Sequence, residues 1–266
     1  MKRRTAVSRL LQILNFLAFV LVIVVNVLAN RIPIGGRTTG EIADMYPNLF
    51  TPAGFAFAIW GVIYLGLALF ALCQAGLLPG VNNGRAVVRD IGWLFILSSL
   101  ANVSWLFAWH YDMIIVSVVF MLLLLISLIG IYQRLQNRDT VSGAEKWFVR
   151  VPFSLYFGWI SVATIANITV ALVSVNWNGF GISPQIWTVI VILVADLLAL
   201  TFLARYRDVW YGLVTAWALF GILYRHLTFF AGQYPSVVYT SLVSIIVLLL
   251  GVLLTTCRNR ASAYVE

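Results

Sequence analysis

Long apolar stretches dominate this sequence, and they restrict its possible folds more than any other feature does. A helix needs about 20 mainly apolar residues to cross the roughly 30 Å of hydrocarbon in a bilayer. Eight stretches reach this length, some with a polar interruption: 10–29, 53–75, 91–109, 113–133, 151–173, 185–204, 209–228 and 236–257. The sequence therefore predicts an all-α integral membrane protein with about eight transmembrane helices in a lipid bilayer.

The composition excludes an ordinary soluble domain. Of the 266 residues, 62% are hydrophobic and 10% are charged, and no soluble domain of this size could hide so much apolar surface. The net charge of +8 would suggest nucleic acid in a soluble protein. Here the basic residues lie in short connections between apolar stretches, so we expect no nucleic-acid partner. Cys73 and Cys257 form no metal-ligand or disulfide pattern, and we expect both to be small buried hydrophobes, with no metal or cofactor.

The Lys and Arg residues predict an orientation, because cytoplasmic connections carry an excess of them. If the N-terminus is cytoplasmic, 14 of the 17 basic residues fall on the cytoplasmic side. The other three, Arg31, Arg37 and Arg225, lie in or near the opposite side. Alternation over eight spans then places both termini in the cytoplasm, and we expect a bacterial inner membrane or a plasma membrane.

Polar and aromatic residues inside the spans are the informative positions, since lipid does not favour them there. Three helix faces carry them: Phe57, Trp60 and Tyr64; Asn102, Trp105 and Trp109; and Tyr156, Trp159, Ala163 and Asn167. Asn26 lies near the outer end of the first span. The predicted orientation brings these groups to a similar depth in the outer half of the membrane. An aromatic wall with a few amides suits a flat apolar ligand, although Trp at interfaces and Asn between packed helices are also common.

Three motifs resemble one known family. Residues 50–64 read Phe-Thr-Pro-Ala-Gly-Phe-Ala-Phe-Ala-Ile-Trp-Gly-Val-Ile-Tyr. They resemble the signature Pro-Pro-Gly-Trp-Val-Phe-Gly-Pro-Val-Trp…Leu-Tyr of the tryptophan-rich sensory protein/translocator protein (TspO/MBR) family. Leu-Ala-Asn-Val-Ser-Trp at 100–105 is similar to the Leu-Asn-x-x-Trp segment in that family's third helix. The run 159–167, with Trp159, Ala163 and Asn167, is similar to a Trp-x-x-x-Ala-Thr-x-x-Asn run in its fifth helix.

The resemblance covers roughly residues 8–175 and predicts a division of the chain. The motifs occur in the family's order, but Ala53 and Phe55 replace a Pro and a Trp of the signature, and three more spans follow the family's five. We expect a TspO-like five-helix unit over 1–175, with a lid loop over 30–52. A three-helix C-terminal extension would then occupy 176–266.

The resemblance also implies a function. Family members bind porphyrins, sterols and synthetic aromatic molecules in a hydrophobic pocket, so we expect this chain to bind, and to sense or transport, such a molecule in an outer-half pocket. A homodimer is compatible with this interpretation. The predicted ligand-binding residues are Phe57, Trp60, Tyr64, Asn102, Trp105, Trp159, Ala163 and Asn167.

The C-terminal spans suggest an alternative of another class. Asp196 lies near the middle of the sixth span and Arg225 in the outer half of the seventh, so they could form an ion pair inside the bilayer. A proton- or ion-coupled secondary transporter would use such a pair. The same two residues could instead only tie helices together, and a scaffold bundle serving a partner protein is a third possibility. No nucleophile is placed beside a base, so we expect no enzymatic activity.

Overall fold

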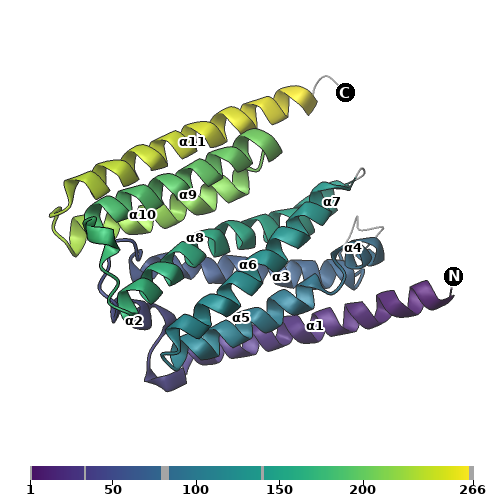
Figure 1. Ribbon diagram of the computed structural model, residues 1–266. Helices are drawn as coiled ribbons and strands as arrows, with labels where there is room; N and C mark the ends of the chain where they lie inside the picture. Colours follow the sequence, from purple (N-terminus) through teal and green to yellow (C-terminus); the bar gives the residue numbers. More distant parts are fainter. Residues whose placement is uncertain (1, 33, 79–83, 139–140, 264–266) are drawn as a thin grey trace. The chain divides into compact units, whose positions relative to one another are not determined.

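The computed structural model describes residues 2–32, 34–78, 84–138 and 141–263, most of which are helical (Figure 1). They form two compact units. The first comprises Met1–Ile42 and Trp60–Ile160, and the second comprises Ala43–Ile59 and Ser161–Glu266. The chain therefore enters the second unit for a short segment, returns to the first, and crosses again inside helix α8 (Val151–Ser174).

The first unit is organised around α5 (Leu94–His110), which packs against both α1 (Lys2–Arg31) and α6 (Ile114–Gln136). Its other elements are η1 (Ile34–Gly36), most of α2 (Thr39–Asp44), α3 (Ile59–Gln74, from Trp60 on), α4 (Gly84–Ile91), α7 (Gly143–Glu145), the π-helical turn η3 (Lys146–Arg150) and the first part of α8. Apolar residues over nearly every position of α6 explain its 23-residue length, since such a helix can bury one face and expose the rest to lipid.

Aromatic packing fills the middle of the first unit. Phe70, Phe95 and Phe153 are each almost fully buried and meet edge to face, with centroid separations of 5.1, 5.0 and 5.9 Å. Beside them, a Cβ on Gly66 would lie 3.0 Å from the Pro152 side chain, so glycine permits the close approach of α3 to the start of α8. These contacts fix the helices that carry the candidate site.

Basic side chains of the first unit gather at one end of its helices. Arg138, after α6, forms salt bridges with Asp90 and with Glu145, the latter at 2.7 Å. Arg134 donates hydrogen bonds to the carbonyls of Asp90 and Ile91, both at 3.1 Å, where α4 ends. Cations favour helix C-termini, so this arrangement caps α4 while holding the connections together.

The second unit contains three helices that pack against one another: α9 (Pro184–Tyr206), α10 (Val209–Thr228) and α11 (Pro235–Ala263). It also holds η2 (Gly54–Ala58), the last part of α8 and η4 (Gly179–Gly181). Local sequence sets the helix starts. Ser183 caps α9 by accepting from the Ile186 N–H with Pro184 following it, and Asp208 caps α10 by accepting from two N–H groups.

Segment 43–59 is bound to α10 along much of its length. The Ala53 N–H donates to the Gly221 carbonyl at 3.0 Å, and the Trp217 indole donates to the Ala56 carbonyl at 2.9 Å. Further along, His226 Nε2 lies 2.9 Å from the Leu49 carbonyl oxygen. These hydrogen bonds pair backbone N–H and C=O groups of segment 43–59 that are not paired within a regular α-helix.

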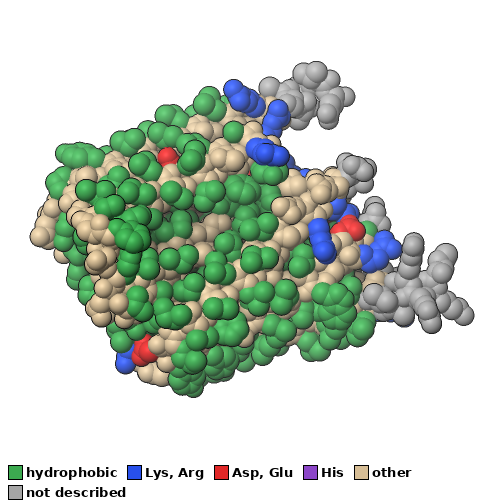
Figure 2. Space-filling model, in the orientation of Figure 1, with side chains coloured by type: hydrophobic (Ala, Val, Ile, Leu, Met, Phe, Trp, Pro, Cys, Tyr) green, Lys and Arg blue, Asp and Glu red, His purple; other side chains and the backbone are tan. Residues whose placement is uncertain are grey.

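Six of the described helical stretches are long and apolar enough to cross a membrane: Ser8–Gly36, Gly54–Gln74, Ile114–Gln136, Gly143–Ser174, Pro184–Tyr206 and Pro235–Asn259. The apolar helix α5 is shorter, at 17 residues, and α10 carries Arg225 and His226 in its last turn. Figure 2 shows apolar side chains over much of the visible face, with the Lys and Arg side chains in view at its edges. Every one of the eight predicted spans coincides with a helix, and the predicted fold class is confirmed.

Candidate functional site

Trp60 is the centre of an aromatic cluster in the first unit. Its ring stacks on Tyr64 at 5.4 Å and lies 6.2 Å from the ring of Trp105. It meets Tyr156 and Trp159 edge to face, at 5.9 and 6.3 Å. Such geometries are the favourable ones for aromatic pairs. Three helices, α3, α5 and α8, thus supply one cluster, and it contains four of the predicted ligand-binding residues: Trp60, Tyr64, Trp105 and Trp159.

Buried amides accompany the rings. The Asn26 side chain donates to Asn102 Oδ1 at 3.0 Å and to the Val22 carbonyl at 2.9 Å, and Asn102 is fully buried. Tyr156 also hydrogen-bonds the Asn102 side chain. Asn102 is the fifth predicted ligand-binding residue in this unit. Its hydrogen bonds to Asn26 on α1 and Tyr156 on α8 connect it to the aromatic cluster.

The Tyr64 hydroxyl of this cluster is buried and has no hydrogen-bond partner among the described residues. A buried polar group without a partner costs about 1–3 kcal/mol, and its presence calls for an explanation. Together with the rings, this hydroxyl forms a buried apolar cluster with a free hydrogen-bonding group. We name this set (Trp60, Tyr64, Asn102, Trp105, Tyr156 and Trp159) the aromatic–amide cluster.

Part of the predicted lid loop contacts the helix that carries Trp105. Trp109 stacks on Trp105 at 5.9 Å, and its indole donates to the Thr39 carbonyl at 3.1 Å. Gly35, with a φ of +71°, comes so close to α5 that an added Cβ would lie 3.0 Å from the His110 carbonyl oxygen. The beginning of the 30–52 loop is therefore held at the same end of α5 as the cluster.

A capping box orders the short helix α2 in this loop. The Glu41 carboxylate accepts from the Thr38 N–H at 2.7 Å and from its hydroxyl at 2.9 Å, and the Glu41 N–H donates back to Thr38 at 3.3 Å. The backbone hydrogen bond, followed by the hydroxyl, lowers the pKa of the Glu41 carboxyl below its ordinary value. The carboxylate is therefore charged at neutral pH and stabilises the start of α2.

Three other predicted ligand-binding residues belong to the second unit. Phe57 lies in the η2 turn and is half-buried, whereas the sequence predicted it on one continuous helix face with Trp60 and Tyr64. The α-helix begins at Ile59, so that face is interrupted. Ala163 is half-buried and Asn167 is 3% exposed, both on α8. The aromatic–amide cluster is therefore defined by the other five predicted residues together with Tyr156.

The possible Asp196–Arg225 ion pair is not the pair that the structure forms. Arg225 instead forms a salt bridge with Asp44, at the end of α2, and its guanidinium lies 5.3 Å from the Phe229 ring centroid. The Asp196 carboxyl hydrogen-bonds Ser244 on α11. The sequence suggested this pair because Asp196 and Arg225 lie at similar depths along their helices. The carboxylate of Asp44, 181 residues from Arg225 in the sequence, is the partner instead.

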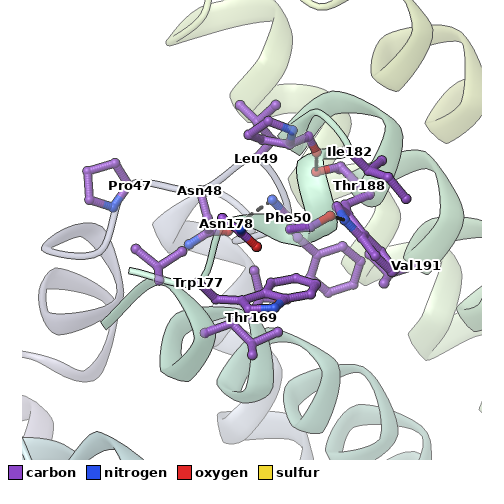
Figure 3. A pocket seen from close by; sticks show the side chains of 15 residues that line it. Pro47, Asn48, Leu49, Phe50, Thr169, Trp177, Asn178, Ile182, Thr188 and Val191 are labelled. Atoms are coloured by element: carbon purple, nitrogen blue, oxygen red, sulfur yellow. Dashed lines mark hydrogen bonds between the residues drawn. The ribbon is translucent and has the colours of Figure 1, made fainter. Parts of the chain in front are cut away.

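A cavity of about 240 Å³ in the second unit was not predicted. Residues 47–50, the end of α8, the η4 turn and the start of α9 line it (Figure 3). Its rings include Trp177 and Trp187, which lie beside predicted membrane boundaries and so resemble ordinary interfacial tryptophans in the sequence. The described residues contain no group of three or more His, Cys, Asp and Glu side chains that could hold a metal ion.

Comparison with known proteins gives one match. The model of a family described as TSPO-like protein matches residues 12–254. The match reaches into α11, the last of the three C-terminal helices, and so extends beyond the region that carries the sequence motifs. No curated protein and no solved structure matches the chain.

Proposed function

The chain belongs to the TSPO-like protein family and is a multi-pass membrane protein, and from this premise we propose that it binds a hydrophobic small molecule at the aromatic–amide cluster. The ligand class is aromatic or porphyrin-like, and the role is to sense or to transport it. The division of the chain at residue 175, with a lid over 30–52, stays a prediction.

The observation that carries this proposal is the unpartnered Tyr64 hydroxyl among packed aromatic rings. Trp60, Trp105 and Trp159 are at most 9% exposed, and a conjugated ring system that separates these rings would stack on their flat faces. The Tyr64 hydroxyl can donate or accept a hydrogen bond. Porphyrins combine an extended ring with peripheral polar groups, so they match both features.

Replacing Tyr64 with phenylalanine separates ligand binding from folding. Because the hydroxyl has no partner among the described residues, its removal should leave the free energy of unfolding unchanged or slightly higher. If it bonds a ligand, the same change should weaken binding about two- to tenfold, the value of one hydrogen bond. Titration of the purified protein with protoporphyrin IX, followed by quenching of tryptophan fluorescence, measures the Kd.

Tyr111→Phe is the matched control, because Tyr111 is 62% exposed at the end of α5 and should bind porphyrin as the unchanged protein does. No saturable quenching in the unchanged protein would contradict the proposed function. Equal affinity of Tyr64→Phe and Tyr111→Phe would remove Tyr64 from the site.

We also propose that both termini are cytoplasmic, in a bacterial inner membrane or a plasma membrane. The gathering of Arg134, Arg138 and their partners at one end of the first unit supports this orientation. Cys257, expected to be buried, is exposed near the end of α11, and Cys73 is buried as expected.

The two natural cysteines make the orientation testable without engineering a label site. A membrane-impermeant maleimide should modify Cys257 in inside-out vesicles and leave it unmodified in intact cells. The Cys257→Ser variant gives the background, which should be low because Cys73 is 1% exposed. Modification of Cys257 in intact cells would show that the C-terminal end of α11 faces the outside, and would contradict the proposed orientation.

A further inference from the structure

The cavity in the second unit has walls from three separate parts of the chain. Leu49 and Phe50 come from segment 43–59, and Val191 comes from α9 (Figure 3). Leu172 lines the cavity from α8. Trp177 and Trp187 complete the aromatic part of the lining. None of the lining residues belongs to the aromatic–amide cluster.

Contacts within the protein hold the aromatic part of the lining, Trp177 and Trp187, in place without a ligand. The Trp187 indole donates to the Gly179 carbonyl at 2.8 Å, and its ring lies 5.3 Å from that of Trp177. Gly179 has a φ of +65°, and an added Cβ would lie 3.2 Å from Trp187 Nε1. Only glycine fits this turn without moving the indole, so the turn and the ring hold each other in place. A preformed wall reduces the entropy lost on binding.

The polar side chains on the lining form hydrogen bonds with backbone groups of the protein. The hydroxyls of Thr169 and Thr188 donate to carbonyls one turn earlier in their own helices, at 2.9 and 2.8 Å. The Asn178 side-chain oxygen accepts from the Phe180 N–H at 3.0 Å, and the Asn48 side chain bonds the backbone of its own turn. None of the described residues that line the cavity is charged. An occupant therefore meets an apolar, uncharged surface.

From this geometry we propose that the cavity is a second binding site, for a neutral aromatic molecule of one or two rings. An apolar cavity of about 150 Å³ is large enough to take up benzene, and drug-sized ligands need about 300 Å³ or more. The 240 Å³ observed lies between these values, so a porphyrin is too large for it. Rings from Phe50, Trp177 and Trp187 favour an aromatic occupant over a saturated one.

The test uses the full-length protein in lipid nanodiscs with 1-bromonaphthalene, whose bromine quenches tryptophan fluorescence on contact. Val191→Phe should fill the cavity and weaken the saturable part of the quenching at least about tenfold, or abolish it. Val194→Phe, three residues along the same helix at a position 46% exposed, adds the same ring outside the cavity and should bind as the unchanged protein does. It also controls for partition of the probe into lipid.

Leu172→Phe fills the cavity from α8 and gives the same loss if Val191→Phe does not yield folded protein, as judged by size-exclusion chromatography. The proposal is overturned if the filling variants and Val194→Phe quench alike. It is also overturned if 1-bromodecane shows the same dependence on Val191→Phe, because an acyl chain would then be the occupant. Protoporphyrin IX binding should be unaffected by Val191→Phe, so failure here is distinct from failure of the proposed function.

Discussion

Gly221→Ala should lower the free energy of unfolding by about 1–3 kcal/mol, the usual cost of overpacking a tight contact. An added Cβ on Gly221 would lie 2.8 Å from the Ala56 Cβ and 2.9 Å from the Pro52 Cβ. Neither neighbour has a flexible side chain that could rotate away, so the backbone of segment 43–59 would have to move. That shift would stretch the hydrogen bond from the Ala53 N–H to the Gly221 carbonyl, which is 3.0 Å long.

Gly61→Ala is the matched control and should act in the opposite direction. Gly61 lies inside α3, and an added Cβ there would meet no atom within 4 Å. Alanine is favoured over glycine in a helix by about 0.5–1 kcal/mol, so this variant should be more stable. SDS-induced unfolding in mixed micelles, followed by circular dichroism, compares the two. A shift of both midpoints in the same direction would contradict the packing described for Gly221.

Trp105→Ala should have the largest effect in the first unit. The Trp105 ring is 4% exposed and lies between Trp60 and Trp109, at 6.2 and 5.9 Å. Truncation of a buried tryptophan removes many contacts and leaves a void, which typically costs about 3–5 kcal/mol. Because the ring is also part of the proposed ligand surface, porphyrin quenching should fall sharply in whatever fraction remains folded.

Trp93→Ala provides the comparison, since Trp93 is 57% exposed just before the same helix. Changes away from packed positions usually stay within about 0.5 kcal/mol, so its unfolding midpoint should change little. Similar loss of stability in both variants would mean that the cluster contributes no special packing to α5.

The helices were predictable because bilayer thickness sets a length that the apolar pattern records directly. The Trp60, Trp105 and Trp159 contacts were predictable for a related reason: spacing along each helix gives its face, and alternating direction gives depth. Phe57 shows where this reasoning fails. Pro52 and Gly54 delay the α-helix, and the Ala56 carbonyl takes a hydrogen bond from Trp217 on a distant helix. Phe57 therefore does not continue the α-helix of Trp60 and Tyr64, and the helical spacing used to place it on their face does not hold.

Arg225 and the second-unit cavity could not be predicted from spacing. The partner of Arg225 is Asp44, whose position depends on how segment 43–59 binds α10, and no local pattern encodes that. The cavity joins Phe50, Trp177 and Trp187 from three parts of the chain. Each of these residues alone is an ordinary apolar or interfacial side chain, and only the tertiary arrangement leaves space between them.

The position of segment 43–59 has a consequence for how the chain can be cut or rebuilt. Its hydrogen-bond partners, Gly221, Trp217 and His226, lie more than 150 residues further along the chain, while the residues on either side of it belong to the first unit. No single cleavage point can therefore separate the two units into self-sufficient fragments. A truncation at residue 175 would strip segment 43–59 of these partners and leave the Ala53 amide and the Ala56 and Leu49 carbonyls without them. The two units are interleaved along the chain, and an engineered fragment that ends at residue 175 would need other partners for segment 43–59.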